Sequence, residues 1–359
     1  MTFHMTRALL VAVLALAAGA AAAQTPVYDT ARWLAGLQLD ASAPVSQAQL
    51  ETNAAWDRLR VTRLAPMKAF AETHFADERA HCDTLFYPFG GPDIINALSF
   101  FPSCKRYILF GLEHVGELPH LERMSAQQKE LVLADMHKAQ QYILRRNYFV
   151  TQYMSSDLNT PNLNGVLPMM SAMLVRMGYV ILDVELANLD GSSPVPAGSR
   201  PRAAHVHFQA QDGGPVQELV FACFDASDQG LARNPDFLTF MAPIQPTVTL
   251  MKAASYLLHD DSFGRMRDLV ENKTSLLVQD DTGLPYAKLL ADGFTVELYG
   301  NYVDTIPVFH YRYQKDLAGA YRAQPAHAAL PFPWSYARRR EEAALQVARK
   351  RSPASASSS

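Results

Sequence analysis

The chain has 359 residues, of which 49% are hydrophobic and 19% are charged, and its formal net charge is -3. This composition allows a sizeable core in one large domain or two smaller ones, and it excludes disorder over most of the length. The balanced charge also gives no reason to expect nucleic acid as a partner, because that binding depends on clustered lysine and arginine.

The start of the chain has the features of a secretory signal peptide. Arg7 precedes an apolar run over residues 8–20, which is too short to span a bilayer, and the small residues 21-AAA-23 form a cleavage site. We therefore expect a signal peptide over residues 1–23 and a periplasmic or secreted mature protein. No later apolar run is long enough for a membrane span.

Residues 24–336 are expected to form a single α/β domain. Tryptophan and leucine recur at roughly helical spacing near the start of this domain, which predicts bracing helices over residues 24–75. Next comes 84-TLFYPF-89 as a strand, a Gly-Gly turn, Pro92 as a first helical residue, and a second strand that ends at Glu113. Strands joined through a helix are parallel, with a right-handed crossover.

This order of strand, Gly-Gly, helix, strand and Glu resembles the opening of class I methyltransferases and other Rossmann-like domains over about 30 residues. The glycine pattern departs from a complete GxGxxG. An exported protein also meets little nucleotide or S-adenosylmethionine. The resemblance therefore implies a sheet with a ligand crevice, and we expect that crevice to have lost the family's ligand.

Three cysteines are present in a chain that is expected to reach a compartment where disulfides persist. Cys82 and Cys104 occupy the same point at the starts of the two consecutive strands, and parallel neighbours about 4.8 Å apart would allow a bridge. We predict a Cys82–Cys104 disulfide, with Cys223 as a buried thiol. Three unpaired cysteines remain an open alternative, because connectivity is not fixed by sequence.

The middle of the chain predicts helices and then a meander. Ser125 caps a long amphipathic helix, and the methionines of 169–177 at helical spacing indicate a core helix. The strands 179–189, 204–210 and 217–226 are joined by short turns and predict an antiparallel meander at one edge. The expected fold is a three-layer, Rossmann-like mixed sheet with a parallel βαβ start.

Towards the C-terminus, helices and strands are expected to alternate. Two helices are predicted over 248–259, capped by Thr247, and over 262–272, capped by Ser262. Strands follow at 275–279 and 294–302, and then a charged helix over 337–351 and a disordered tail complete the chain. No repeat of fixed period is present.

Acidic and glycine residues follow three of the predicted strands. In an open sheet, ligands bind outside the carboxyl ends of parallel strands. If these strands are neighbours, their loops converge on one crevice, where carboxylates suit acid and base catalysis or a divalent cation. The alternative is that Asp93 only favours a helix N-terminus and that the Asp280 run is an ordinary turn. The candidates are Asp93, Glu113, Asp280 and Asp281 as catalytic residues, and Gly90, Gly91 and His114 as ligand-binding residues.

A second candidate site lies on the predicted meander. His205 and His207 lie two residues apart on one strand and therefore face the same side, as in a two-histidine metal site. The same alternation is typical of any half-exposed strand. The chain contains no GxSxG elbow, no HExxH motif and no Walker loop.

Three functional hypotheses follow. The leading one is an exported cell-envelope protein of unassigned activity that binds a small polar molecule or an envelope glycan in the crevice. No cofactor is expected for it, with a divalent metal as the alternative. The second is a metal-dependent hydrolase that uses the His-x-His pair. The third is a non-catalytic envelope scaffold.

Overall fold

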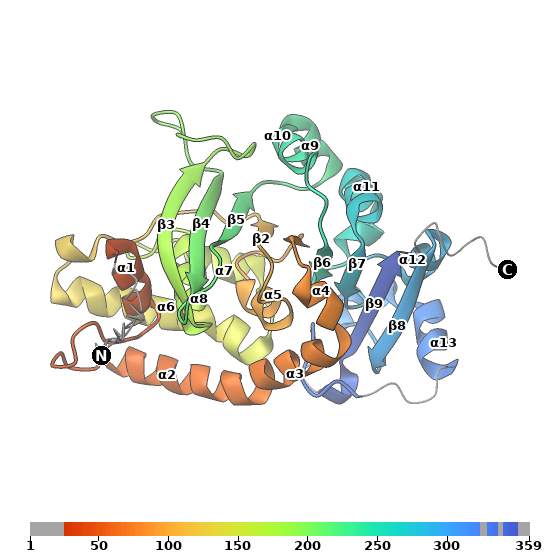
Figure 1. The fold of residues 1–359 in the computed structure, drawn as a ribbon, viewed down its shortest axis with the longest axis horizontal. Helices are drawn as coiled ribbons and strands as arrows, with labels where there is room; N and C mark the ends of the chain where they lie inside the picture. Colours follow the sequence, from red (N-terminus) through yellow and green to blue (C-terminus); the bar gives the residue numbers. More distant parts are fainter. Residues whose placement is uncertain (1–24, 324–328, 337–339, 351–359) are drawn as a thin grey trace, which may run out of the picture.

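The structure, a computed structural model, describes residues 25–323, 329–336 and 340–350. The expected signal peptide and C-terminal tail lie outside the described residues. These ranges contain one mixed sheet of nine strands in the order β3-β4-β5-β2-β1-β6-β7-β9-β8 (Figure 1). The strands are β1 (Thr84–Tyr87), β2 (Arg106–Gly111), β3 (Tyr179–Ala187), β4 (Ala203–Ala210), β5 (Gln217–Cys223), β6 (Val248–Met251), β7 (Leu276–Gln279), β8 (Phe294–Gly300) and β9 (Ala344–Lys350).

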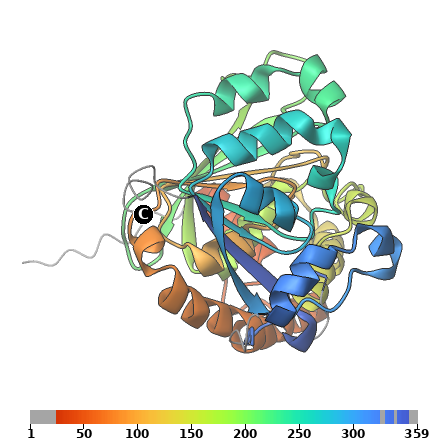
Figure 2. The ribbon, with the colours of Figure 1, turned by 90° about the vertical axis from the view of Figure 1, so that its right-hand side faces the viewer.

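Helices cover both faces of this sheet, which gives the three layers expected from the sequence. Figure 2 shows the teal helices above the sheet and the orange N-terminal helices below it. None of the helices in the described ranges combines the length and apolarity needed to cross a bilayer. The α-helices are α1 (Pro26–Leu34), α2 (Gln47–Leu59), α3 (Ala65–His74), α4 (Ala76–Ala80), α5 (Ile94–Phe100), α6 (Ala126–Arg146), α7 (Thr151–Asp157), α8 (Leu167–Arg176), α9 (Asp228–Arg233), α10 (Asp236–Met241), α11 (Gly264–Lys273), α12 (Tyr286–Ala291) and α13 (Lys315–Ala323).

Five strands at the centre of the sheet, β5, β2, β1, β6 and β7, are parallel. Numbered in chain order they follow the 3-2-1-4-5 order of a doubly wound sheet, so the topology reverses between β1 and β6. Strand β9 is antiparallel and lies between β7 and β8.

The meander and the disulfide are confirmed. β3, β4 and β5 pair antiparallel at one edge of the sheet, and β5 continues parallel to β2. Cys82 and Cys104 form a disulfide just before β1 and β2. Cys223 is an unpaired thiol, but it is only half-buried, because it is the last residue of β5 and not an interior one.

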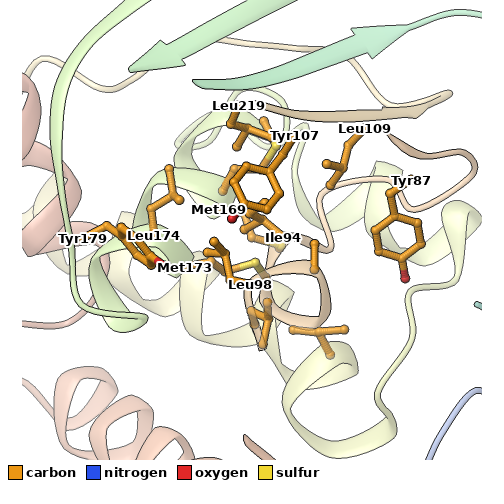
Figure 3. Close-up of a cluster of buried hydrophobic side chains, with 14 of the residues drawn as sticks. Tyr87, Ile94, Leu98, Tyr107, Leu109, Met169, Met173, Leu174, Tyr179 and Leu219 are labelled. Carbon is orange, nitrogen blue, oxygen red and sulfur yellow. The ribbon is translucent and has the colours of Figure 1, made fainter. Parts of the chain in front are cut away.

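The central strands are mostly apolar because both of their faces are covered. In β1, Phe86 faces one hydrophobic cluster while Leu85 and Tyr87 face the other. The Met-rich helix α8 packs into the second of these clusters, which confirms it as core. Figure 3 shows Met169 and Met173 of α8 in this cluster.

Residues 248–259 do not form the predicted helix. Val248–Met251 is the buried strand β6 between β1 and β7, and a loop with left-handed backbone at Ala253, Ser255 and Tyr256 follows it. Pairing on both sides overrides the helix propensity of this short segment. The turn after β7 holds this loop in place. Asp280 Oδ2 accepts from Ala253 N at 2.6 Å, and Thr282 Oγ1 accepts from Ala254 N at 2.7 Å.

The predicted charged helix over 337–351 is wrong as well, since Ala344–Lys350 is the strand β9. Its apolar residues are buried between β7 and β8, and Gln346 Nε2 donates to Asp280 O at 3.1 Å. Arg349 reaches the rim, where it pairs with Glu78 and Glu297 at 2.8 Å each. Paired neighbours on both sides therefore outweigh the helical charge pattern.

Two predicted helix starts also shift. The first helical residue of α5 is Ile94, not Pro92, and the side chain of the preceding Asp93 accepts from Asn96 N. Helix α11 begins at Gly264 and is not capped by Ser262. A turn at Gly91 and Pro92 comes before α5, and a 3-10 helix over Asp261–Phe263 comes before α11.

Candidate functional site

Two adjoining cavities open at the carboxyl ends of the central parallel strands. The first, about 470 Å³, lies over the loops after β1, β2 and β6, where the topology reverses. The second, about 850 Å³, lies beside the loop after β7. They share Tyr148, Ile306, Val308 and Tyr336 as a common wall. We call the two together the crevice.

The first cavity contains four of the seven candidate residues at the strand ends, namely Gly90, Gly91, Asp93 and Glu113. The second contains Asp281. The prediction that the three acidic loops would come from neighbouring strands is wrong in one respect, because β6 separates β1 from β7. The acidic loops are therefore divided between the two cavities.

The floor of the first cavity is a buried ion pair between Asp93 and Lys252, at 2.8 Å. Asp93 also accepts from Tyr87 Oη at 3.0 Å and from Asn96 Nδ2 at 2.8 and 2.7 Å, so its carboxylate is well satisfied. Lys252 Nζ donates to the carbonyl of Asn147 as well. Burial lowers the pKa of Lys252, and the charge of Asp93 opposes that shift. The pair joins the loops on either side of the topological reversal.

Glu113 lies over two glycines of this floor. It is buried, and its carboxylate lies where a Cβ on Gly111 would clash. Gly91 has φ 53°, in the left-handed region that favours glycine, and it also faces Glu113. The glycines therefore give the Glu113 carboxylate room at the ends of β1 and β2.

Unfavourable backbone conformations are concentrated around the crevice. A non-glycine residue with positive φ is uncommon, and such strain is often found at functional sites. Within the described ranges six residues have it, and five of them line the two cavities. A sixth, Asn147, ends α6 and accepts the hydrogen bond from Lys252. The five are Phe89, Ala253, Ser255, Tyr256 and Ser335.

Asp280 and Asp281 have different roles. Asp280 is fully buried and lines neither cavity; it accepts from the backbone of Ala253 and from Thr282 N at 2.7 Å, so it holds the loop after β6 to β7. Asp281 accepts from the hydroxyl of Tyr256. Burial, reinforced by the charge of Asp280, raises the pKa of Asp281 to about 7. A carboxyl with this pKa is a suitable proton donor or acceptor near neutral pH.

His114 does not join the crevice. It is exposed and lines two further cavities with Arg200 and Pro201, on the meander side. The chain turns away from the crevice after Glu113, so the two adjacent residues face different cavities.

The His-x-His pair lies near the amino ends of β5 and β2, whereas the crevice lies at the carboxyl ends of the parallel strands. His205 Nδ1 is 2.6 Å from Glu218 Oε1, and His207 Nδ1 is 2.7 Å from Asp183 Oδ1. Glu218 is in register with Arg106, the first residue of β2, and pairs with it. The part of the chain that the structure describes holds no group of three or more His, Cys, Asp or Glu residues placed to bind a metal ion. Each histidine therefore has a carboxylate partner but no metal site around it.

Sequence reasoning missed several residues of the crevice. Lys252 follows directly after β6, and reading 248-VTLM-251 as a buried strand would have indicated it. Tyr148 and Tyr336 come from the ends of distant segments, and no local pattern marks them.

No protein-family model matches the chain, and comparison with curated proteins finds no significant relative. The crevice itself is therefore the basis for a function.

Proposed function

We propose that this protein is exported to the cell envelope and binds a small polar, glycan-like molecule in the crevice. The observation that carries the proposal is the shared wall of Tyr148 and Tyr336 above the buried Asp93–Lys252 pair. Aromatic walls with a few fixed polar groups are typical of small-molecule sites, and both cavities have volumes usual for them.

The chemistry of the walls favours a sugar. Tyrosine rings offer flat apolar faces with a polar end, which suit the C–H faces and hydroxyl groups of sugar rings. Tyr148 and Tyr336 contact each other edge to face, with centroids 4.9 Å apart. The buried Trp334 adds another aromatic side chain to the lining of the second cavity.

The floor supports a ligand other than a nucleotide. Phe89 occupies the left-handed position just before Gly90, and its ring packs against Phe110 and Phe263. Asp93 and Lys252 fill the point where the topology reverses, at which a Rossmann-like domain receives its ligand. These features support the expectation that the family's ligand has been lost.

The Cys82–Cys104 disulfide supports export, because disulfides persist in oxidising compartments. The leading signal-like segment motivates the same proposal. Mass spectrometry of the protein recovered from the periplasm or medium is expected to find an N-terminus near Gln24, and a retained residue 1–23 segment would contradict export.

The binding proposal can be tested by calorimetry with neutral, amino and acidic disaccharides: cellobiose, chitobiose and digalacturonate. At least one is expected to bind saturably, and Tyr148→Ala should weaken it about tenfold. Tyr311→Ala is the matched control, because Tyr311 is exposed and lines neither cavity. The proposal fails if none of the sugars binds, or if the two variants behave alike.

A further inference from the structure

The second cavity differs from the first in the charge of its lining. In the first, Lys252 neutralises Asp93 at a distance of 2.8 Å. The second is lined by three carboxyl groups, and none of its described lining residues is a lysine, an arginine or a histidine. The three are Asp281, Asp304 and Glu342. The lining therefore produces a negative potential, which favours a ligand with a positive charge.

This negative charge is not cancelled by ion pairs within the described ranges. Asp304 and Glu342 are exposed, and neither forms an ion pair with another described residue. Burial raises the pKa of Asp281, and the charges of Asp280 and Asp304 raise it further. Asp281 thus lies in the field of a second carboxylate of the same cavity, and a bound cation would relieve their repulsion.

Aromatic side chains line the same cavity. An ammonium group within about 6 Å of an aromatic ring centroid is attracted to the face of the ring. The fold contains such a contact beside the cavity, since Lys252 Nζ lies 5.8 Å from the ring centroid of Trp334. Rings together with carboxylates suit an organic ammonium group. The other rings of the lining are those of Tyr148, Tyr256, Tyr302 and Tyr336.

A metal ion suits this cavity less well than an organic cation. A divalent ion needs several oxygen ligands within about 2–3 Å of one point. Among the residues that the structure describes, no group of three or more His, Cys, Asp or Glu residues is placed in that way. The cavity has a volume of about 850 Å³, which is usual for a small molecule and much larger than an ion. The carboxyl groups therefore suit a cation that is part of a larger, polar molecule.

The common wall connects this cavity to the sugar site proposed above. Tyr148 and Tyr336 line both cavities, so a disaccharide that lies against them places part of one sugar ring in the second cavity. In an amino sugar that ring carries an ammonium group and otherwise matches the ring of a neutral sugar. The wall thus supplies the sugar contacts, and the second cavity supplies the contacts to the charge.

We propose that the ligand is a sugar with free amino groups, and that the second cavity binds an ammonium group of it among Asp281, Asp304, Glu342 and the tyrosine rings. This inference rests on the proposed function, since it gives the charge of the ligand for the same crevice.

The test compares three disaccharides of the same ring and linkage by calorimetry on the full mature protein, at a mildly acidic pH that keeps free amino groups protonated. They are chitobiose, with two free amino groups, and the neutral N,N′-diacetylchitobiose and cellobiose. Chitobiose is expected to bind about tenfold more tightly than either neutral sugar. Added salt should weaken the binding of chitobiose more than that of cellobiose, because screening acts on charges.

The double variant Asp304→Asn with Glu342→Gln should weaken chitobiose about tenfold, to the affinity of cellobiose. Asp212→Asn with Glu130→Gln is the matched control, because it removes the same charge from two exposed residues that line neither cavity. Cellobiose or digalacturonate that binds as tightly as chitobiose, or two double variants that behave alike, overturns the ammonium site and leaves the small-ligand function standing. Absence of binding by all of these sugars removes the proposed function itself.

Discussion

Asp93 and Asp281 are buried carboxylates at the same edge of the same sheet, but their neighbours differ. Asp93 touches the ammonium group of Lys252, whereas Asp281 has the hydroxyl of Tyr256 and lies next in the chain to a second carboxyl, Asp280. The first cavity is therefore built on a neutralised pair, and the second on an acid whose pKa is raised. The comparison shows that position at a strand end does not set the state of a carboxylate; the groups packed against it do.

The largest effect on stability is expected from replacing Lys252, the cation of the buried pair in the first cavity. Lys252→Met leaves Asp93 buried without its cation, and we expect a loss of about 3–5 kcal/mol in the free energy of unfolding, measured with urea. The double variant Lys252→Met with Asp93→Asn should recover most of that loss, because neither charge remains.

Lys288→Met provides the control for this change. Lys288 is half-exposed and pairs with Glu271 at 3.1 Å and Asp292 at 3.3 Å near the surface, so its loss is expected to be at most about 1 kcal/mol. Similar losses for the two lysine variants would show that the floor of the first cavity is not a special buried pair.

The raised pKa of Asp281 can be tested through the pH dependence of the free energy of unfolding. The pKa of Asp281 is about 7 in the folded protein and about 4 when unfolded, so between these values the folded state binds more protons. The contribution of Asp281 to the free energy of unfolding is fully present below about pH 4. It is lost as the pH rises to about 7, and the loss amounts to about 2–4 kcal/mol. Asp281→Asn should remove much of this decline in urea unfolding from pH 4 to 7. An unchanged decline would contradict the assignment.

The smallest effect is expected at the glycines. Gly91→Ala and Gly293→Ala both place a side chain at positive φ, 53° and 79°, and each should cost about 1 kcal/mol of stability. Only Gly91 faces Glu113 and the crevice, whereas nothing lies near a Cβ on Gly293. Ligand affinity should fall for the first variant alone; equal affinities would place the ligand elsewhere.

The sequence predicted the parts of the fold that local patterns specify. The parallel start, the meander and the Cys82–Cys104 bridge follow from apolar runs, turns and matched positions on consecutive strands. Strands β6 and β9 were missed, because a four-residue strand and a strand with charged ends look helical until their partners are known. Pairing partners far along the chain carry that information.

The candidate site was predicted only in part, because local patterns show some of its residues and not others. Glycines and acids after strands are visible locally, and the structure brings Gly91, Asp93 and Glu113 into one cavity. The wall of Tyr148 and Tyr336 joins segments nearly two hundred residues apart, which no spacing rule can show.

The central claim is that the ligand lies at the ends of β1, β2 and β6, and hydrogen exchange tests it most directly. Amide exchange would be followed by mass spectrometry with and without a saturating concentration of the disaccharide that binds most tightly in calorimetry. Slower exchange is predicted in residues 89–93, 111–113, 148–150 and 252–257, with β4 unchanged. Slower exchange only around β4, or unchanged exchange in all four segments when the ligand is bound, would contradict the account.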